Sequence, residues 1–226
     1  MESLKTNLKI IAGVLAGLTV VWVVLTVYLM WGVKHYWTPQ QYMVWLTRSP
    51  GLQVLSYVNV VLLTLVNVLF FTLLYLYFRT SRPVLSLAGF IFIPIYGVIN
   101  FVCYAIQISA VPKMVRLALE GDRTYAFAGE LIQANPGSVV GVLNGYAYGI
   151  LGIPLLVMGH LLARDLKPGS GFLFMGSGAA SLVGAVGITV KSALFAKGLM
   201  LGGVLFLLAL LRFVHEFRAR PTEDLT

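Results

Sequence analysis

Six apolar runs, each long enough to cross a lipid bilayer, divide this chain and constrain its fold more than any other feature. About 20 mostly apolar residues span the hydrocarbon core of a membrane. The runs cover residues 8–33, 53–78, 84–110, 138–162, 171–190 and 196–213. The alternating pattern of a membrane barrel is absent, and isolated strands would leave backbone groups unsatisfied in lipid, so the runs must be helices. The sequence predicts an all-α, polytopic integral membrane protein, a six-helix transmembrane bundle in which residues 1–226 form one domain.

The composition supports a lipid environment and excludes several classes of protein. Hydrophobic residues make up 59% of the chain and charged residues only 11%, with a mean hydropathy of +0.89. Soluble domains are about half apolar and about a quarter charged. We therefore exclude a soluble globular domain, a disordered chain and a nucleic-acid-binding module. The net charge of +8 is expected to hold the chain against anionic headgroups, which makes membrane lipids the first predicted partner.

The connections between the runs predict the orientation of the chain in the membrane. Two short connections are dense in basic residues, with Arg79 and Arg82 in one and Arg164 and Lys167 in the other. Under the positive-inside rule both face the cytoplasm. We therefore expect both termini to be cytoplasmic, most simply in a plasma membrane, and the long connections 34–52 and 111–137 to be outer loops.

The two outer loops carry different patterns. The first contains four aromatic residues typical of a belt at the membrane interface, namely Tyr36, Trp37, Tyr42 and Trp45. The second contains two amphipathic stretches, at residues 113–120 and 123–134, that are expected either to cap the bundle or to form a lid over an outward cavity. Proline interrupts the third and fourth runs, at Pro94 and Pro154, where we expect kinks.

Small residues recur at four-residue spacing in four of the runs. Close backbone approach over such stripes drives helix association in lipid. The residues expected to pack helices together are Gly13, Gly17, Gly141, Gly145, Gly149, Gly176, Ala180, Gly184, Gly198 and Gly202. The stripes serve either packing within one chain or an interface with a second copy or a partner membrane subunit.

Uncharged polar residues within the runs are the most informative feature for function. Amides in hydrocarbon are costly unless they are paired, so they must face one another or a wet cavity. The residues concerned lie in the second, third and fourth runs: Asn59, Asn67, Tyr96, Asn100, Gln107, Asn144 and Tyr148. They form either interhelical hydrogen bonds or a pocket for a neutral or amphipathic molecule in the outer half of the membrane.

Groups that carry reactions are scarce. The apolar runs contain no Asp or Glu, the single cysteine is Cys103, and the histidines His35, His160 and His215 share no motif. We therefore expect no metal, no cofactor and no catalytic residue. The leading hypothesis is a non-enzymatic membrane protein, similar in action to a transporter, sensor or accessory subunit, that binds a neutral or lipid-like molecule. One alternative is a structural or assembly subunit docking through the glycine faces, and a second is an intramembrane lipid-modifying enzyme.

Overall fold

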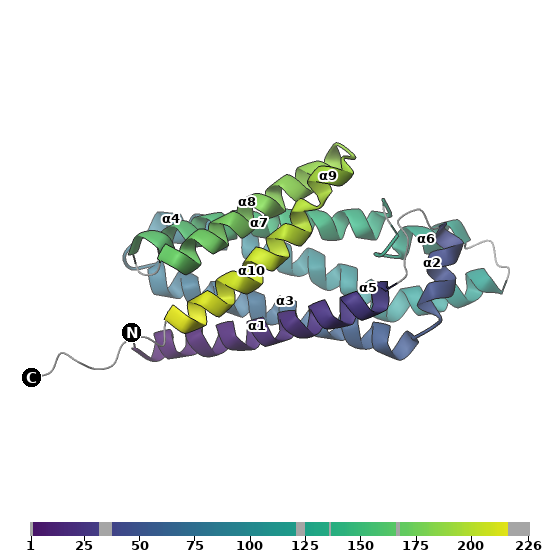
Figure 1. Ribbon diagram of the computed structural model, residues 1–226, viewed down its shortest axis with the longest axis horizontal. Coiled ribbons are helices and arrows are strands. Elements are labelled where there is room, and N and C mark those ends of the chain that lie inside the picture. The colour runs from purple at the N-terminus through teal and green to yellow at the C-terminus, as the bar shows by residue number, and fades with distance from the viewer. Residues whose placement is uncertain (1, 32–37, 121–124, 136, 166–167, 217–226) are drawn as a thin grey trace, which may run out of the picture. The chain divides into compact units, whose positions relative to one another are not determined.

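A computed structural model describes residues 2–31, 38–120, 125–135, 137–165 and 168–216, and within these ranges the chain is all-α (Figure 1). Six stretches are long and apolar enough to span a membrane, which confirms the predicted fold class of a multi-pass helical membrane protein. The helices are α1 (Glu2–Met30), α2 (Pro39–Leu46), α3 (Pro50–Phe78), α4 (Pro83–Phe90), α5 (Phe92–Leu119), α6 (Tyr125–Leu131), α7 (Val139–Asp165), α8 (Pro168–Thr189), α9 (Ala193–Ala196) and α10 (Gly198–Glu216).

The two connections expected to be outer loops contain more helix than the hydropathy indicates. In the first, Thr38 caps α2 with a reciprocal pair of hydrogen bonds to Gln41, and Pro39 occupies the first turn. In the second, the helix of the third run continues past residue 110 through Pro112 and ends only at Leu119. Hydropathy marks the part of a helix that lies in hydrocarbon, whereas the helix itself continues into the interfacial layer.

The two prolines expected to cause kinks behave differently. The carbonyl four residues before Pro94 belongs to Phe90, and the helix breaks there, so that α4 ends at Phe90 and α5 begins at Phe92. Pro154 lies inside α7, which continues without interruption to Asp165.

Contacts between Cα atoms divide the chain into two compact units. The first unit comprises Met1–Gly17, Val66–Tyr96 and Tyr148–Thr226, and the second comprises Leu18–Leu65 and Gly97–Ala147. Helices α1, α3, α5 and α7 contribute residues to both units, whereas α8 to α10 belong only to the first and α2 and α6 only to the second.

Glycine stripes bring the helices of the first unit into close backbone contact, and α8 and α10 run side by side in Figure 1. A Cβ placed on Gly198 would meet the carbonyl oxygen of Ala180 and the backbone of Gly184. The Ser177 hydroxyl also donates a hydrogen bond of 2.8 Å to the Gly202 carbonyl. Such spacing excludes any larger side chain and is how helices associate in lipid.

The remaining glycines expected to pack helices differ in their surroundings. Gly149 lies against Ala185 of α8, and Gly176 is at ordinary distance from Leu205. Gly141 lies against the backbone of the segment that precedes α7, and Gly145 is buried. Gly13 and Gly17 are exposed on α1, with nothing within 4 Å of a Cβ at either position. Their pattern in the sequence is the same, but α1 does not use them against the described part of the chain.

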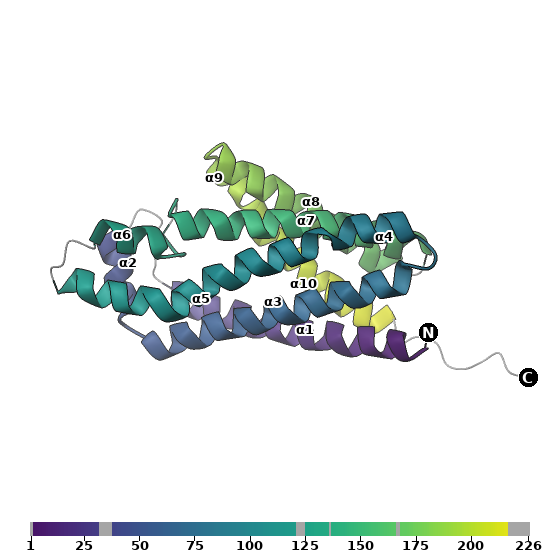
Figure 2. The ribbon, with the colours of Figure 1, turned by 180° about the vertical axis from the view of Figure 1, so that it is seen from behind.

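The core of the second unit is built where α2 and α6 lie next to each other, as Figure 2 shows. Tyr42 and Trp45 of α2 are buried with Val111, Val115 and other apolar side chains of α5 and α6. The expectation that these two aromatic residues face the membrane interface is therefore wrong, because their rings fill the space between helices. Tyr36 and Trp37 lie outside the described residues. Burial raises the pKa of the Tyr42 phenol.

Candidate functional site

A pocket of about 480 Å³ opens between the beginning of α3 and the end of α5, within the second unit. We call it the α3–α5 pocket. Its walls are mostly apolar, and it is lined by Leu46, Thr47, Pro50, Gln53, Val54, Tyr57, Gln107, Val111, Pro112, Val115, Arg116, Leu119 and Glu120. Its volume falls within the range of roughly 300–1,000 Å³ common for small-molecule sites, and a mostly apolar wall with a few polar groups is typical of such sites.

Two polar groups in the lining retain hydrogen-bonding capacity. The Gln53 side chain is only 5% exposed, and its Nε2 makes a hydrogen bond at the limiting distance of 3.5 Å to the Trp45 carbonyl. Neither the Gln53 Oε1 nor the Tyr57 hydroxyl has a hydrogen-bond partner among the described residues. The pocket therefore offers an acceptor and a phenol to a ligand that carries a hydroxyl group.

Another polar residue of the lining, Gln107, is held in place by backbone atoms. Its Nε2 donates to the Leu131 carbonyl at 2.6 Å, and its Oε1 accepts from the Gln133 amide at 3.2 Å. These two bonds use the acceptor and one of the two donors of the carboxamide, so that one N–H remains. Gln107 thus joins α5 to the end of α6 and the residues that follow it, and it presents a fixed wall to the pocket.

A chain of three carboxamides lies in the same unit. Gln133 Nε2 donates to Asn144 Oδ1 at 2.8 Å, and Asn144 Nδ2 donates to Asn100 Oδ1 at 2.8 Å. Asn100 Nδ2 and Gln133 Oε1 are buried without a partner in the described structure. If the oxygen and nitrogen of all three carboxamides were exchanged, Asn100 would present the unpartnered oxygen and Gln133 the unpartnered N–H. In either assignment the chain therefore has one donor and one acceptor without a partner.

The remaining predicted polar residues bond elsewhere. Asn59 Nδ2 donates to the Leu18 carbonyl of α1 at 3.1 Å. Asn67 Nδ2 donates to the Tyr96 hydroxyl at 3.2 Å, and the rings of Tyr96 and Tyr148 lie 6.0 Å apart. These last three residues belong to the first unit.

The seven predicted ligand-binding residues are divided between the two units: the second holds Asn59, Asn100, Gln107 and Asn144, and the first holds Asn67, Tyr96 and Tyr148. Of the seven, Gln107 alone lines the α3–α5 pocket, and most of the others hydrogen-bond helices together. The predicted ligand-binding set did not include Gln53 and Tyr57, which lie in the first turns of α3, or Gln133, which lies in the turn after α6. The capping signature at Thr38 was the available clue that a helix lies over this end of α3.

The rim of the pocket carries one charge of each sign. Arg116 Nε lies 4.0 Å from Glu120 Oε1, and both side chains are largely exposed. An exposed pair at this spacing contributes little to stability, about 0.3–0.5 kcal/mol. Its effect is to make the rim neutral overall.

Reactive groups are not gathered at the pocket. Cys103 is buried, and its Sγ lies 3.9 Å from the Val140 carbonyl oxygen. Within the described ranges no group of three or more His, Cys, Asp or Glu side chains lies close enough to hold a metal ion.

The carboxamide chain generates the first test. We expect Asn100→Ala and Asn144→Ala to destabilise the protein non-additively, with a coupling energy of about 0.6–1.7 kcal/mol, because each loses the same interhelical bond. Thermal unfolding of the purified protein in detergent measures this coupling. Asn59→Ala combined with Asn144→Ala is the matched control and should be additive, because Asn59 bonds the Leu18 carbonyl instead. Additive effects for the first pair would contradict a structural role for the bond.

Comparisons with known proteins give no relative from which a function could be carried over. No protein-family model, no curated protein and no solved structure matches the chain.

Proposed function

We propose that this protein is a non-enzymatic, multi-pass membrane protein that binds a neutral, lipid-like molecule in the α3–α5 pocket. The observation that carries the proposal is the combination of apolar walls with the free carbonyl oxygen of the nearly buried Gln53. An apolar chain removes the walls from water, and a hydroxyl group on the ligand can donate a hydrogen bond to Gln53 Oε1.

The charges at the rim favour a neutral ligand over an anionic one. An anionic headgroup attracted by Arg116 would also meet Glu120, which lies 4.0 Å from the guanidinium. The two contributions oppose each other at this short distance. An uncharged headgroup with hydroxyls gains hydrogen bonds and encounters no net repulsion.

Filling the pocket tests the proposal. Val54 lines the pocket, and Val58, one turn later on α3, is exposed and does not line it. We expect Val54→Trp to lower crosslinking of the purified full-length protein to a photoactivatable monoacylglycerol several-fold, because the indole occupies the space for the chain. Val58→Trp adds the same side chain outside the pocket and should label like the wild type. Equal labelling of the two variants, measured by mass spectrometry, would show that the ligand does not bind in the α3–α5 pocket.

We also propose that both termini are cytoplasmic and that the membrane is the plasma membrane. The short turn between α3 and α4 contains Arg79 and Arg82, and such dense, short connections follow the positive-inside rule most closely. The α3–α5 pocket then opens toward the outer leaflet.

Cysteine labelling tests this orientation. In a Cys103→Ala background, Thr47→Cys should react with a membrane-impermeant maleimide in intact cells. Ser81→Cys, in the turn after α3, should react only after the membrane is permeabilised. Labelling of Ser81→Cys in intact cells would reverse the proposed orientation.

One observation favours the second candidate function, assembly with another membrane chain. Gly13 and Gly17 form a small-residue stripe on an exposed face of α1, and open space surrounds a Cβ at either position. Two copies of α1 could approach closely along this face, as small-residue stripes allow in lipid. The simplest partner is a second copy of this chain.

Gly17→Leu tests the assembly function without disturbing the fold, because nothing within 4 Å of Gly17 has to move. We expect this variant to lower the dimer fraction measured by analytical ultracentrifugation in detergent. Gly203→Leu, at a glycine of α10 with equally open space, is the control and should leave the dimer fraction unchanged. A monomeric wild-type protein would exclude self-assembly through this face.

A further inference from the structure

A second groove, of about 650 Å³, lies between α1 and the α2–α3 turn within the second unit, and no part of the proposed function uses it. We call it the α1–α2 groove. One side is apolar and consists of Val23, Val24, Val27 and Tyr28 of α1. Val24, Val27 and Tyr28 are 57–64% exposed, so the groove opens on a surface of α1. In a chain of this composition such a surface faces lipid.

The α2 side of the groove is fixed to α1 by a partly buried hydrogen bond. The Trp45 indole Nε1 donates to the Leu29 carbonyl at 2.9 Å, and both residues line the groove. This bond satisfies the Leu29 carbonyl, which lies in the last turn of α1, where carbonyl groups have no backbone N–H partner within the helix. The groove is therefore a formed feature of the fold.

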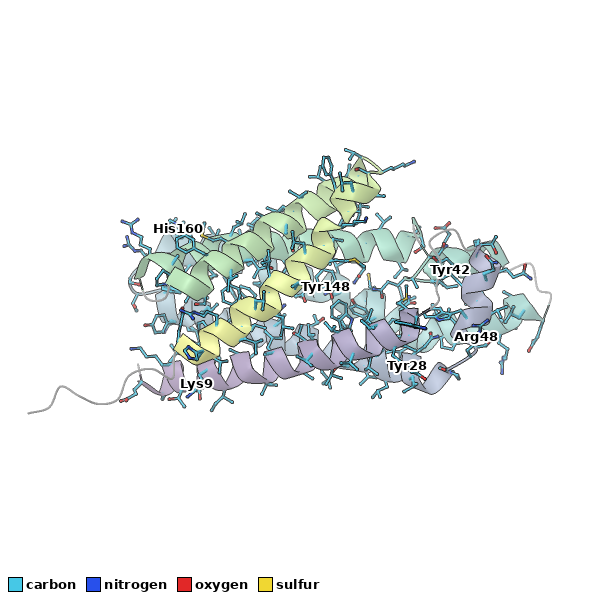
Figure 3. The ribbon with its side chains drawn as sticks, in the orientation of Figure 1. Lys9, Tyr28, Tyr42, Arg48, Tyr148 and His160 are labelled. Atoms are coloured by element: carbon cyan, nitrogen blue, oxygen red, sulfur yellow. The ribbon has the colours of Figure 1, made fainter. Side chains whose placement is uncertain are left out.

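Arg48 connects this groove to a second, polar hollow. Its side chain lines the α1–α2 groove and also a pocket of about 290 Å³ formed with Gln40, Gln41 and Val44 on α2. Arg48 is exposed and makes no ion pair with any described residue. It is the single charged residue among the described linings of the two hollows. Figure 3 labels Arg48 and Tyr28, which lie at the same end of the unit.

We propose that an anionic phospholipid occupies the α1–α2 groove. Its acyl chain lies along the valines of α1, its phosphate lies on Arg48, and the rest of its headgroup reaches the amides of Gln40 and Gln41. Charge complementarity favours this occupant, because Arg48 is the only charged residue among the described linings of the two hollows and it lies next to an apolar wall. A guanidinium binds a phosphate through two parallel N–H donors, which fixes the headgroup at the depth where the chain enters the groove.

The contrast with the α3–α5 pocket makes the assignment specific. Arg116 at the rim of that pocket has a carboxylate within 4.0 Å, whereas Arg48 has none among the described residues. The two hollows share Gln53 in their linings yet differ in net charge. The inference stands independently of the proposed function, since it uses a different arginine and different apolar walls.

Native mass spectrometry of the full-length protein in detergent tests the site, with phosphatidylglycerol and phosphatidylcholine added at equal concentration. We expect the wild type to retain phosphatidylglycerol about fivefold better at low salt, as one basic group near a lipid surface provides. Arg48→Gln should reduce phosphatidylglycerol retention to the level of phosphatidylcholine. Lys113→Gln is the matched control, because it removes the same charge from an exposed position of the same unit outside all three hollows.

A second pair of variants tests the acyl chain. Val27→Trp, within the groove, should lower retention of both lipids, whereas Val20→Trp, on an exposed position of α1 outside the lining, should not. Inorganic phosphate at constant ionic strength should leave phosphatidylglycerol bound, because it lacks the chain. Equal retention by Arg48→Gln and Lys113→Gln, no effect of Val27→Trp, or displacement by inorganic phosphate would each overturn the proposal.

Discussion

The structure depends on one constraint: a polar atom within the membrane must find its partner inside the protein, because lipid supplies none. Asn59 meets this requirement with a backbone carbonyl of α1, and Gln107 meets it with one backbone group at the end of α6 and one just after it. Asn144 meets it by joining Asn100 and Gln133 into one chain of carboxamides. In each case the partner lies on another helix or in the turn after α6, so the bond that offsets the cost of burying an amide also fixes how those segments pack.

This constraint also determines where a ligand can bind. Most amides among the helices already bond another part of the chain, yet Asn67 Oδ1, Asn100 Nδ2 and Gln133 Oε1 are buried without a partner in the described structure. Capacity for a hydrogen bond also remains on Gln53, in the first turn of α3. The α3–α5 pocket lies beside Gln53, where α3 begins and α5 ends.

The sequence predicts the six spanning helices because apolar length is a local property that lipid imposes on each segment separately. It does not predict which apolar or small residues face another helix. Gly184 and Gly17 belong to similar stripes, yet the first lies against Leu199 and the second faces open space. Polar contacts between helices depend on rotation about each helix axis, which hydropathy does not encode. The helix α2 was predictable from the capping pattern at Thr38, whereas Gln53 stood at the edge of an apolar run and carried no signal of its own.

The two hollows of the second unit differ in charge, and this difference separates the two lipid sites that we propose. Both hollows are lined by Gln53, and both have apolar walls suited to an acyl chain. Since burial of a chain is favourable in either, the walls do not discriminate between lipids. Discrimination comes from the rim, where Glu120 offsets Arg116 in one hollow and Arg48 stands without a described counter-ion in the other. We therefore propose a neutral ligand for the α3–α5 pocket and an anionic phospholipid for the α1–α2 groove. The difference is that Arg116 lies beside a carboxylate, whereas Arg48 has none among the described residues.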